Sequence, residues 1–111
     1  MLNSKNISWI FNDTNNDIGL VRFDLKIKND YLSYLISKPF RGMGLSKIML
    51  KMAIKKKIKI RNNNITAVSF IENEISNKIL LSLGFKIFSK NINTFNYRYS
   101  YNNWWKIYDN T

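Results

Sequence analysis

The residues best suited to chemistry lie in a glycine-containing segment, residues 38–46, with the sequence KPFRGMGLS. It contains two of the chain's four glycines, Gly42 and Gly44, and it stands between a strand-like run and a helix-like run. Glycine lets the backbone turn tightly and approach a ligand without a Cβ in the way. Amides at a helix N-terminus carry a partial positive charge and bind phosphates. The segment therefore predicts a site that holds a diphosphate through main-chain amides.

A second interpretation of this segment is a turn from a strand into a helix that needs glycine for its backbone alone. Neither standard nucleotide-binding pattern fits. A P-loop needs Gly-Lys-Ser/Thr after four intervening residues, and a dinucleotide fingerprint needs a third glycine at position 47, where the chain has Lys47. The order of apolar run, proline, aromatic residue, Arg-Gly-x-Gly and amphipathic helix favours the anion site.

Two motifs together carry a resemblance to a known family. Residues 41–46, Arg-Gly-Met-Gly-Leu-Ser, resemble the Arg/Gln-x-x-Gly-x-Gly/Ala signature of the GNAT superfamily of N-acetyltransferases, with Ser46 in place of the second Gly or Ala. Residues 72–76, Glu-Asn-Glu-Ile-Ser, followed by Leu-Gly-Phe at 83–85, are similar to the family's Asn-x-x-Ala/Ser helix that ends in Gly-Phe. A strand separates the two motifs, as in the family, and the resemblance covers residues 7 to about 101.

The resemblance implies that the chain binds acetyl-CoA as a co-substrate and needs no metal. In the family, the glycine segment holds the diphosphate, and the end of the preceding strand splays from its neighbour and pairs with the pantetheine arm. A backbone amide near Ile36 and Ser37 is implied as the oxyanion donor. The residues implied to contact the cofactor are Leu35, Ile36, Ser37, Arg41, Gly42, Met43, Gly44, Leu45, Ser46 and Asn73.

The groups that move protons are harder to assign. Many family members have a Tyr at the position of Leu80 as the acid for the leaving thiolate, and a Glu at the position of Val68; this chain has neither. Amine acetylation still requires removal of the amine proton. Glu72 and Asp24 are the candidate catalytic carboxylates, and both are also ordinary candidates for surface charges. Attack assisted by positioning and water alone is the other possibility.

Composition excludes several kinds of site. The chain has 111 residues, of which 45% are hydrophobic, and this length supports one domain spanning 1–111. It has no cysteine and no histidine, which excludes disulfides, thiol nucleophiles, typical zinc sites and a Ser-His triad. The sequence shows neither a secretory signal pattern nor an apolar run of membrane-spanning length, and we expect a cytoplasmic protein without membrane contact.

The net charge of +11 has three interpretations. The densest positive run, residues 55–61 (KKKIKIR), is first expected to be a solvated helix face in a chain biased toward Lys, Asn, Ile and Tyr. Attraction of an anionic cofactor or a nucleotide-linked substrate comes second. Nucleic-acid binding comes last.

Hydrophobic patterns predict a mixed α/β (α+β) fold with a mostly antiparallel sheet and two packed helices. We expect a hairpin from residues 7–11 and 18–24, a strand at 31–37 that is covered on both faces, and a strand at 65–70 parallel to it. A closing hairpin is expected from 85–88 and 94–101. Arg22, in the first hairpin, faces water or reaches a bound anion.

Two helices complete the predicted fold. The first runs from residue 45 to about 60, and the residues expected to face the sheet are Leu45, Ile48, Met49, Met52 and Ala53. The second begins at Asn73 as N-cap and stops at Gly84. Its expected inward residues are Ile75, Ile79, Leu80 and Leu83.

The sequence therefore predicts an N-acetyltransferase that transfers the acetyl group of acetyl-CoA to a primary amine. Residues 18–24 with the glycine segment resemble acetyltransferases of amino-sugar nucleotides, which implies a nucleotide-linked acceptor. The alternatives are a non-catalytic acyl-CoA-binding module that acts with a partner and an acetyltransferase of protein N-termini or lysines. The family's first strand and helices have no counterpart here, so we expect either a short form that completes its sheet as a homodimer or a module of a larger protein. The apolar tail 102–111 is expected to cover a groove or a second subunit.

Overall fold

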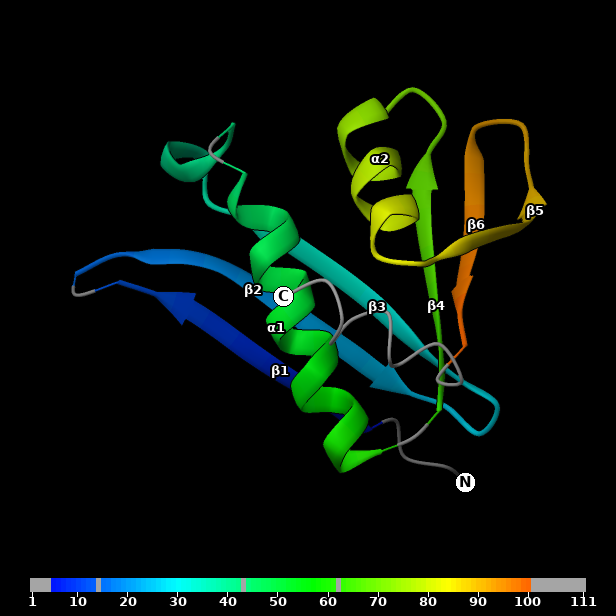
Figure 1. Cartoon of the computed structure of the whole chain (residues 1–111), viewed down its shortest axis with the longest axis horizontal. Helices are drawn as coiled ribbons and strands as arrows, with labels where there is room; N and C mark the ends of the chain where they lie inside the picture. The colour runs from blue at the N-terminus through cyan, green and yellow to red at the C-terminus, as the bar shows by residue number, and fades with distance from the viewer. Residues whose placement is uncertain (1–4, 14, 43, 62, 101–111) are drawn as a thin grey trace.

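Six strands form one continuous sheet in the order β1-β2-β3-β4-β6-β5 (Figure 1). The structure is a computed structural model, and it describes residues 5–13, 15–42, 44–61 and 63–100. The elements are β1 Lys5–Asn12, β2 Asp17–Leu25, β3 Asn29–Ile36, the short 3-10 helix η1 Lys38–Phe40, α1 Leu45–Ile60, β4 Asn64–Phe70, α2 Glu74–Ser82, β5 Lys86–Lys90 and β6 Thr94–Tyr99. The expected tail at 102–111 and Tyr101 lie outside the described residues.

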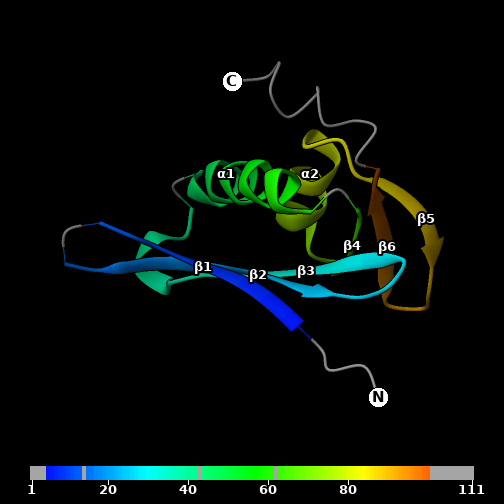
Figure 2. The same ribbon diagram turned by 90° about the horizontal axis from the view of Figure 1, so that it is seen from below.

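The topology matches the predicted mixed fold. The β1–β2 hairpin pairs Ile7 with Phe23 and Trp9 with Val21, and β5–β6 closes the other edge in an antiparallel pair. Among the described strands, only β3 and β4 pair in parallel, because the chain crosses over through α1 between them. Both helices lie on the same face of the sheet (Figure 2). The strand at 31–37 is therefore covered on one face and not on both as expected, and Tyr31 and Leu35 are 44% and 56% exposed. No helix in the described part of the chain is long and apolar enough to cross a membrane.

The core lies between the sheet and its two helices. Alternate residues of the strands point toward the helices, so Val21, Phe23, Tyr97 and Tyr99 are fully buried. Burial of a large apolar side chain contributes about 1.5–3 kcal/mol. Trp9 adds an edge-on ring contact to Phe23, with centroids 6.0 Å apart. Packing in this core fixes the positions of β2, β3 and β4 relative to the helices.

The buried face of α1 differs from the prediction. The helix has the predicted bounds, but Ile48 and Met52 are 57% and 46% exposed. The buried residues of this helix are Met49, Leu50, Ala53, Ile54 and Lys57. The predicted and the buried stripes share Met49 and Ala53, which are buried as predicted, and both stripes repeat at intervals of three and four residues. Packing against the twisted sheet selects the second one.

The second helix is also largely as predicted. Asn73 caps it by accepting a hydrogen bond from the Ser76 amide at 3.2 Å, and Gly84 follows its end with φ of 104°. Leu80 and Leu83 are buried, as expected. Ile75 is 74% exposed, so its expected inward position is wrong. In the first turn this side chain lies outside the stripe that meets β4.

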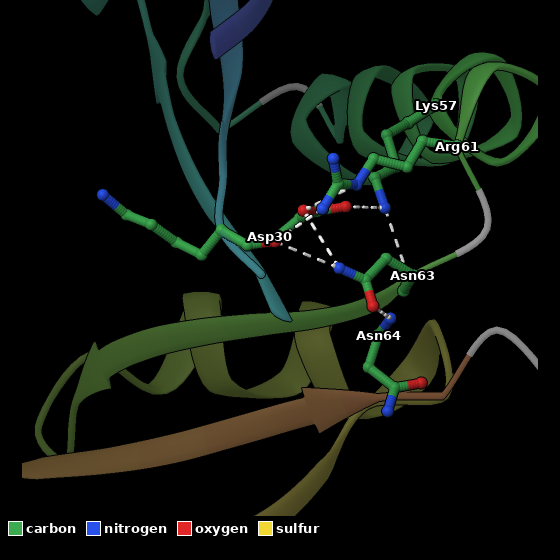
Figure 3. A network of polar contacts seen from close by, with 6 residues as sticks. Asp30, Lys57, Arg61, Asn63 and Asn64 are labelled. Carbon is green, nitrogen blue, oxygen red and sulfur yellow. Dashed lines mark hydrogen bonds and ion pairs between the residues drawn. The ribbon is translucent and has the colours of Figure 1, made fainter. Parts of the chain in front are cut away.

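Residues 55–61 were predicted to form a solvated helix face, but Lys57 within this run is buried. Its side chain is fully buried and forms an ion pair with Asp30, the second residue of β3 (Figure 3). Asp30 also meets Arg61, whose Nε lies 3.3 Å from Oδ1, and Asn63, whose Nδ2 donates to Oδ1 at 3.3 Å. Burial lowers the pKa of Lys57 below its ordinary value. The network joins the end of α1 to the starts of β3 and β4.

Candidate functional site

The parallel strands β3 and β4 separate soon after they meet. Their ladder runs only from Asn29–Asn64 to Tyr31–Thr66, whereas β3 continues to Ile36 and β4 to Phe70. Figure 1 shows the two strands diverging from this junction. A cavity of about 260 Å³ lies along the opening. The residues that line it are Leu32, Ser33, Tyr34, Ala67, Val68, Ser69, Phe70, Asn73, Ser76 and Leu80.

The free edge of β3 presents backbone groups to this opening. The Ser37 amide donates to the Ile18 carbonyl of the β2 segment at 2.7 Å. In an antiparallel ladder, alternate residues direct their N–H and C=O groups to the same neighbour. Tyr34 and Ile36 therefore direct theirs away from β2, toward the opening. Because the Ser37 amide already donates to the Ile18 carbonyl, the Ile36 amide is the expected oxyanion donor.

The glycine segment forms an open turn at the start of α1. Gly42 and Gly44 have φ of 79° and 73°, a backbone region that favours glycine, and Gly44 is the N-cap of the helix. A Cβ built at either glycine would meet no heavy atom of the described chain within 4 Å. No side chain of the described residues caps the first turn of α1, which begins with Leu45 and Ser46. The predicted contact residue Met43 lies outside the described residues.

Close packing and Arg41 hold this turn beside the end of β3. A Cβ on Gly19 of β2 would lie only 2.6 Å from Sδ of Met49 and 2.7 Å from the carbonyl oxygen of Leu35. The first turns of α1 are thus seated on β2 and β3. Arg41 Nε donates to the Ile36 carbonyl at 3.1 Å. The guanidinium therefore places a positive charge where the glycine turn meets the free edge of β3.

The N-terminus of α2 forms the other wall of the opening. Asn77 Nδ2 donates to the carbonyls of Phe70 and Ile71 at 3.0 and 3.1 Å, and its Oδ1 accepts from the Tyr97 hydroxyl at 2.7 Å. Burial raises the pKa of Tyr97, which keeps this hydroxyl protonated as a donor. These bonds fix the helix start to the end of β4. Asn73 lines the cavity as well as capping the helix.

One contact at the site was missed by sequence reasoning. The hydroxyls of Tyr34 in β3 and Ser76 in α2 lie 2.7 Å apart, so a hydrogen bond spans the opening. The residues are 42 positions apart in the sequence. Tyr34 follows the buried Asp30 and Leu32 at alternate positions of β3, so its side chain points toward the helices. No pattern in the sequence indicated this contact.

The two candidate carboxylates lie outside the cavity and apart from each other. Asp24 in β2 pairs with Arg22, whose Nη2 is 3.2 Å from Oδ2, and it lines a separate depression with Lys26, Lys28, Asn29 and Tyr31. Glu72 is exposed in the turn between β4 and α2, beside Ile71 and Asn93. Of the predicted cofactor residues, Arg41 contacts Ile36 and Asn73 lines the cavity, whereas neither predicted catalytic carboxylate lines it.

The chain matches no family model and no curated protein. Solved structures do match it. A chimera of the Vibrio cholerae spermidine N-acetyltransferase superposes with a TM-score of 0.83 at 15% identity, covering 90% of this chain and 69% of that one. The same enzyme in complex with CoA and spermine gives 0.78 at 15%, with 85% and 64% covered.

A third match comes from a different kind of acetyltransferase. The ribosomal-protein-S5-alanine acetyltransferase of Vibrio fischeri superposes with a TM-score of 0.70 at 20% identity, and the alignment covers 79% of this chain and 56% of that one. Agreement at this level establishes the fold. The chain has the fold of the GNAT-type N-acetyltransferases.

Proposed function

We propose that the chain is an N-acetyltransferase that moves the acetyl group of acetyl-CoA to a primary amine. The observation that carries the proposal is the free edge of β3, which diverges from β4 after Tyr31 beside an open glycine turn at the head of α1. An extended ligand with amide groups can pair with such an edge. A diphosphate suits the amides of the turn. An enzyme of this fold has been solved with CoA and spermine.

In this assignment each part of acetyl-CoA meets a distinct element. The diphosphate lies at the amides of Gly42, Met43, Gly44, Leu45 and Ser46, with Arg41 beside it. The pantetheine arm follows Leu35, Ile36 and Ser37, and Asn73 faces it from α2. The Ile36 amide donates to the oxyanion that forms when the amine attacks the thioester.

The amine proton needs an acceptor, and Glu72 and Asp24 are the proposed carboxylates. Glu72 directly precedes Asn73, which lines the cavity, so it is the nearer in the chain to the reacting groups. Loss of the amine proton requires an ionised base. We expect Glu72→Gln or Asp24→Asn, whichever removes the base, to lower kcat about 100-fold in a thiol-release assay.

The acceptor is proposed to be an amine that also carries negative charge, such as an amino-sugar nucleotide. The chain has 18 Lys and Arg against 7 Asp and Glu. The described residues that line the cavity include no acidic side chain. Such a surface repels a polyamine and attracts a phosphate-bearing amine. Arg22, opposite Ser33 in the β2–β3 ladder, is the cation nearest in register to the cavity lining.

Replacing Arg22 with alanine should raise the KM for an amino-sugar nucleotide about tenfold and leave the KM for acetyl-CoA unchanged. A charge-assisted hydrogen bond to phosphate contributes about 1.5–3 kcal/mol, and partial exposure of the side chain reduces this gain. Steady-state kinetics with each substrate varied in turn measures both constants. Arg98→Ala is the matched control, because Arg98 is also in a strand but stacks 4.3 Å above the Phe88 ring. A lower KM for spermidine than for the sugar nucleotide would contradict the proposal.

Calorimetric titration with acetyl-CoA and with free CoA tests the cofactor. A thiol-release assay with amino-sugar nucleotides, peptides with free N-termini or lysines, and polyamines then tests transfer. Absence of heat with both cofactors would refute the assignment. Cofactor binding without thiol release from any acceptor would identify a non-catalytic module, and release with peptides alone would identify a protein acetyltransferase. Light scattering on the same sample tests the expected homodimer.

A further inference from the structure

The cavity between β3 and β4 contains one group that suits a proton-transfer role. When an amine displaces a thiolate from a thioester, the sulfur must take up a proton. Among the described residues that line the cavity, Tyr34 is the only one with a titratable side chain. Phenols ionise near pH 10, close enough to thiols to exchange a proton with them. The serine and asparagine side chains around it lack this property.

The position of Tyr34 is defined by its neighbours on both walls. Its ring packs against the core on the helix side of β3, and its hydroxyl lies 2.7 Å from Ser76 Oγ. Ser76 is held in turn by the Asn73 cap at the start of α2. Leu80, one turn further along α2, is buried and supplies only an apolar surface. The Tyr34 hydroxyl is thus fixed inside the opening from which β3 and β4 diverge.

We propose that Tyr34 protonates the departing CoA thiolate and that Ser76 positions it; this rests on the proposed acetyl transfer. The amine nitrogen forms a bond to the thioester carbon and passes its proton through water to the proposed carboxylate base, Glu72 or Asp24. The C–S bond then breaks, its electron pair goes to sulfur, and the carbonyl reforms. Sulfur takes the phenol proton, and the resulting phenolate recovers a proton through water from the carboxylic acid that received it from the amine. The products are the acetamide and CoA thiol, with no net change in protons.

A purely structural role for the same hydrogen bond gives a different set of results. Removing either the Tyr34 or the Ser76 hydroxyl would then lower stability by a similar amount. Turnover would fall only because less of the protein is folded. In the catalytic role, Tyr34 touches the sulfur and Ser76 acts only through Tyr34. Their variants should therefore separate in kcat.

The experiment compares Tyr34→Phe, Ser76→Ala and Tyr31→Phe in acetyl-CoA turnover with the best acceptor of the amine panel. We expect Tyr34→Phe to lower kcat about 100-fold with little change in the KM for acetyl-CoA, and Ser76→Ala to lower it about tenfold. Tyr31→Phe is the matched control, since Tyr31 is 44% exposed on the same strand and points to the opposite face. The basic limb of the kcat profile should vanish in Tyr34→Phe and move to lower pH when a fluorinated tyrosine occupies position 34 alone.

Each outcome has a definite meaning. Unchanged kcat in Tyr34→Phe, or equal losses in Tyr34→Phe and Ser76→Ala with an unmoved basic limb, overturns the assignment of Tyr34 while the acetyltransferase proposal stands. Absence of acetyl-CoA binding to the unaltered chain in calorimetry, or binding without transfer to any amine, overturns both. Thermal unfolding of all three variants, followed by circular dichroism, shows whether they remain folded at the assay temperature.

Discussion

Replacing Asp30 with asparagine should lower the free energy of unfolding by about 3–5 kcal/mol, because it leaves a buried ammonium without its anion. Asp30 and Lys57 both have fully buried side chains and form an ion pair. Asparagine preserves the shape of the residue but removes the charge that compensates Lys57 and Arg61. Urea denaturation at neutral pH, followed by circular dichroism, measures the loss. Because the unpaired ammonium is buried, salt screens it little, and added salt should not restore the stability of the variant.

The matched control is Lys57→Met, which removes the cation from the same pair. Asp30 then keeps Arg61 at 3.3 Å and the Asn63 amide at 3.3 Å, so we expect a smaller loss. Burial lowers the pKa of Lys57 below its ordinary value of 10.5, so the unfolded chain binds more protons between the two values. Stability should therefore rise with pH in that window for the unaltered chain relative to Lys57→Met. An Asp30→Asn variant no less stable than Lys57→Met would contradict this account of the network.

Local signals predicted most elements of the fold. The bounds of α1 follow from Gly44 at its start and the asparagines after Arg61, and α2 follows from its Asn73 cap and Gly84. These are backbone preferences of single residues, which the sequence displays directly. The inner stripe of α1 is different, since two stripes satisfy the same helical period. Which one is buried depends on the sheet, and so does the burial of Lys57, whose partner Asp30 lies in another element.

The candidate site divides in the same way. The glycine turn and Asn73 were predictable because each motif is contiguous and has a backbone purpose. The bond between Tyr34 and Ser76 exists only because β3 and α2 meet across the opening, so no pattern within either segment indicates it. Glu72 and Asp24 were selected for their charge alone, and the structure places both outside the cavity. Their residue type made these carboxylates candidates, but only the tertiary structure shows that they do not line the cavity.

Replacing Gly44 with valine should weaken binding of CoA and acetyl-CoA about 100-fold or more while the chain stays folded. The site where the valine Cβ would lie has no heavy atom of the described chain within 4 Å, so the added Cβ fits the turn of the unliganded protein without a clash. It would occupy the space in which the diphosphate approaches the amides. Charge-assisted hydrogen bonds contribute about 1.5–3 kcal/mol each, and loss of two gives this factor. Isothermal calorimetry with free CoA measures it.

Backbone strain is the competing cause and needs its own control. Gly44 has φ of 73°, where valine is disfavoured by about 1–3 kcal/mol. Gly44→Asn separates the two effects, because asparagine tolerates this backbone yet still fills the turn. Gly84→Asn, at a φ of 104° beyond the end of α2, carries a comparable substitution away from the turn and should bind CoA normally. If Gly44→Asn is folded and keeps the affinity of the unaltered chain, the diphosphate does not lie on these amides, and the free edge of β3 alone would have to hold the cofactor.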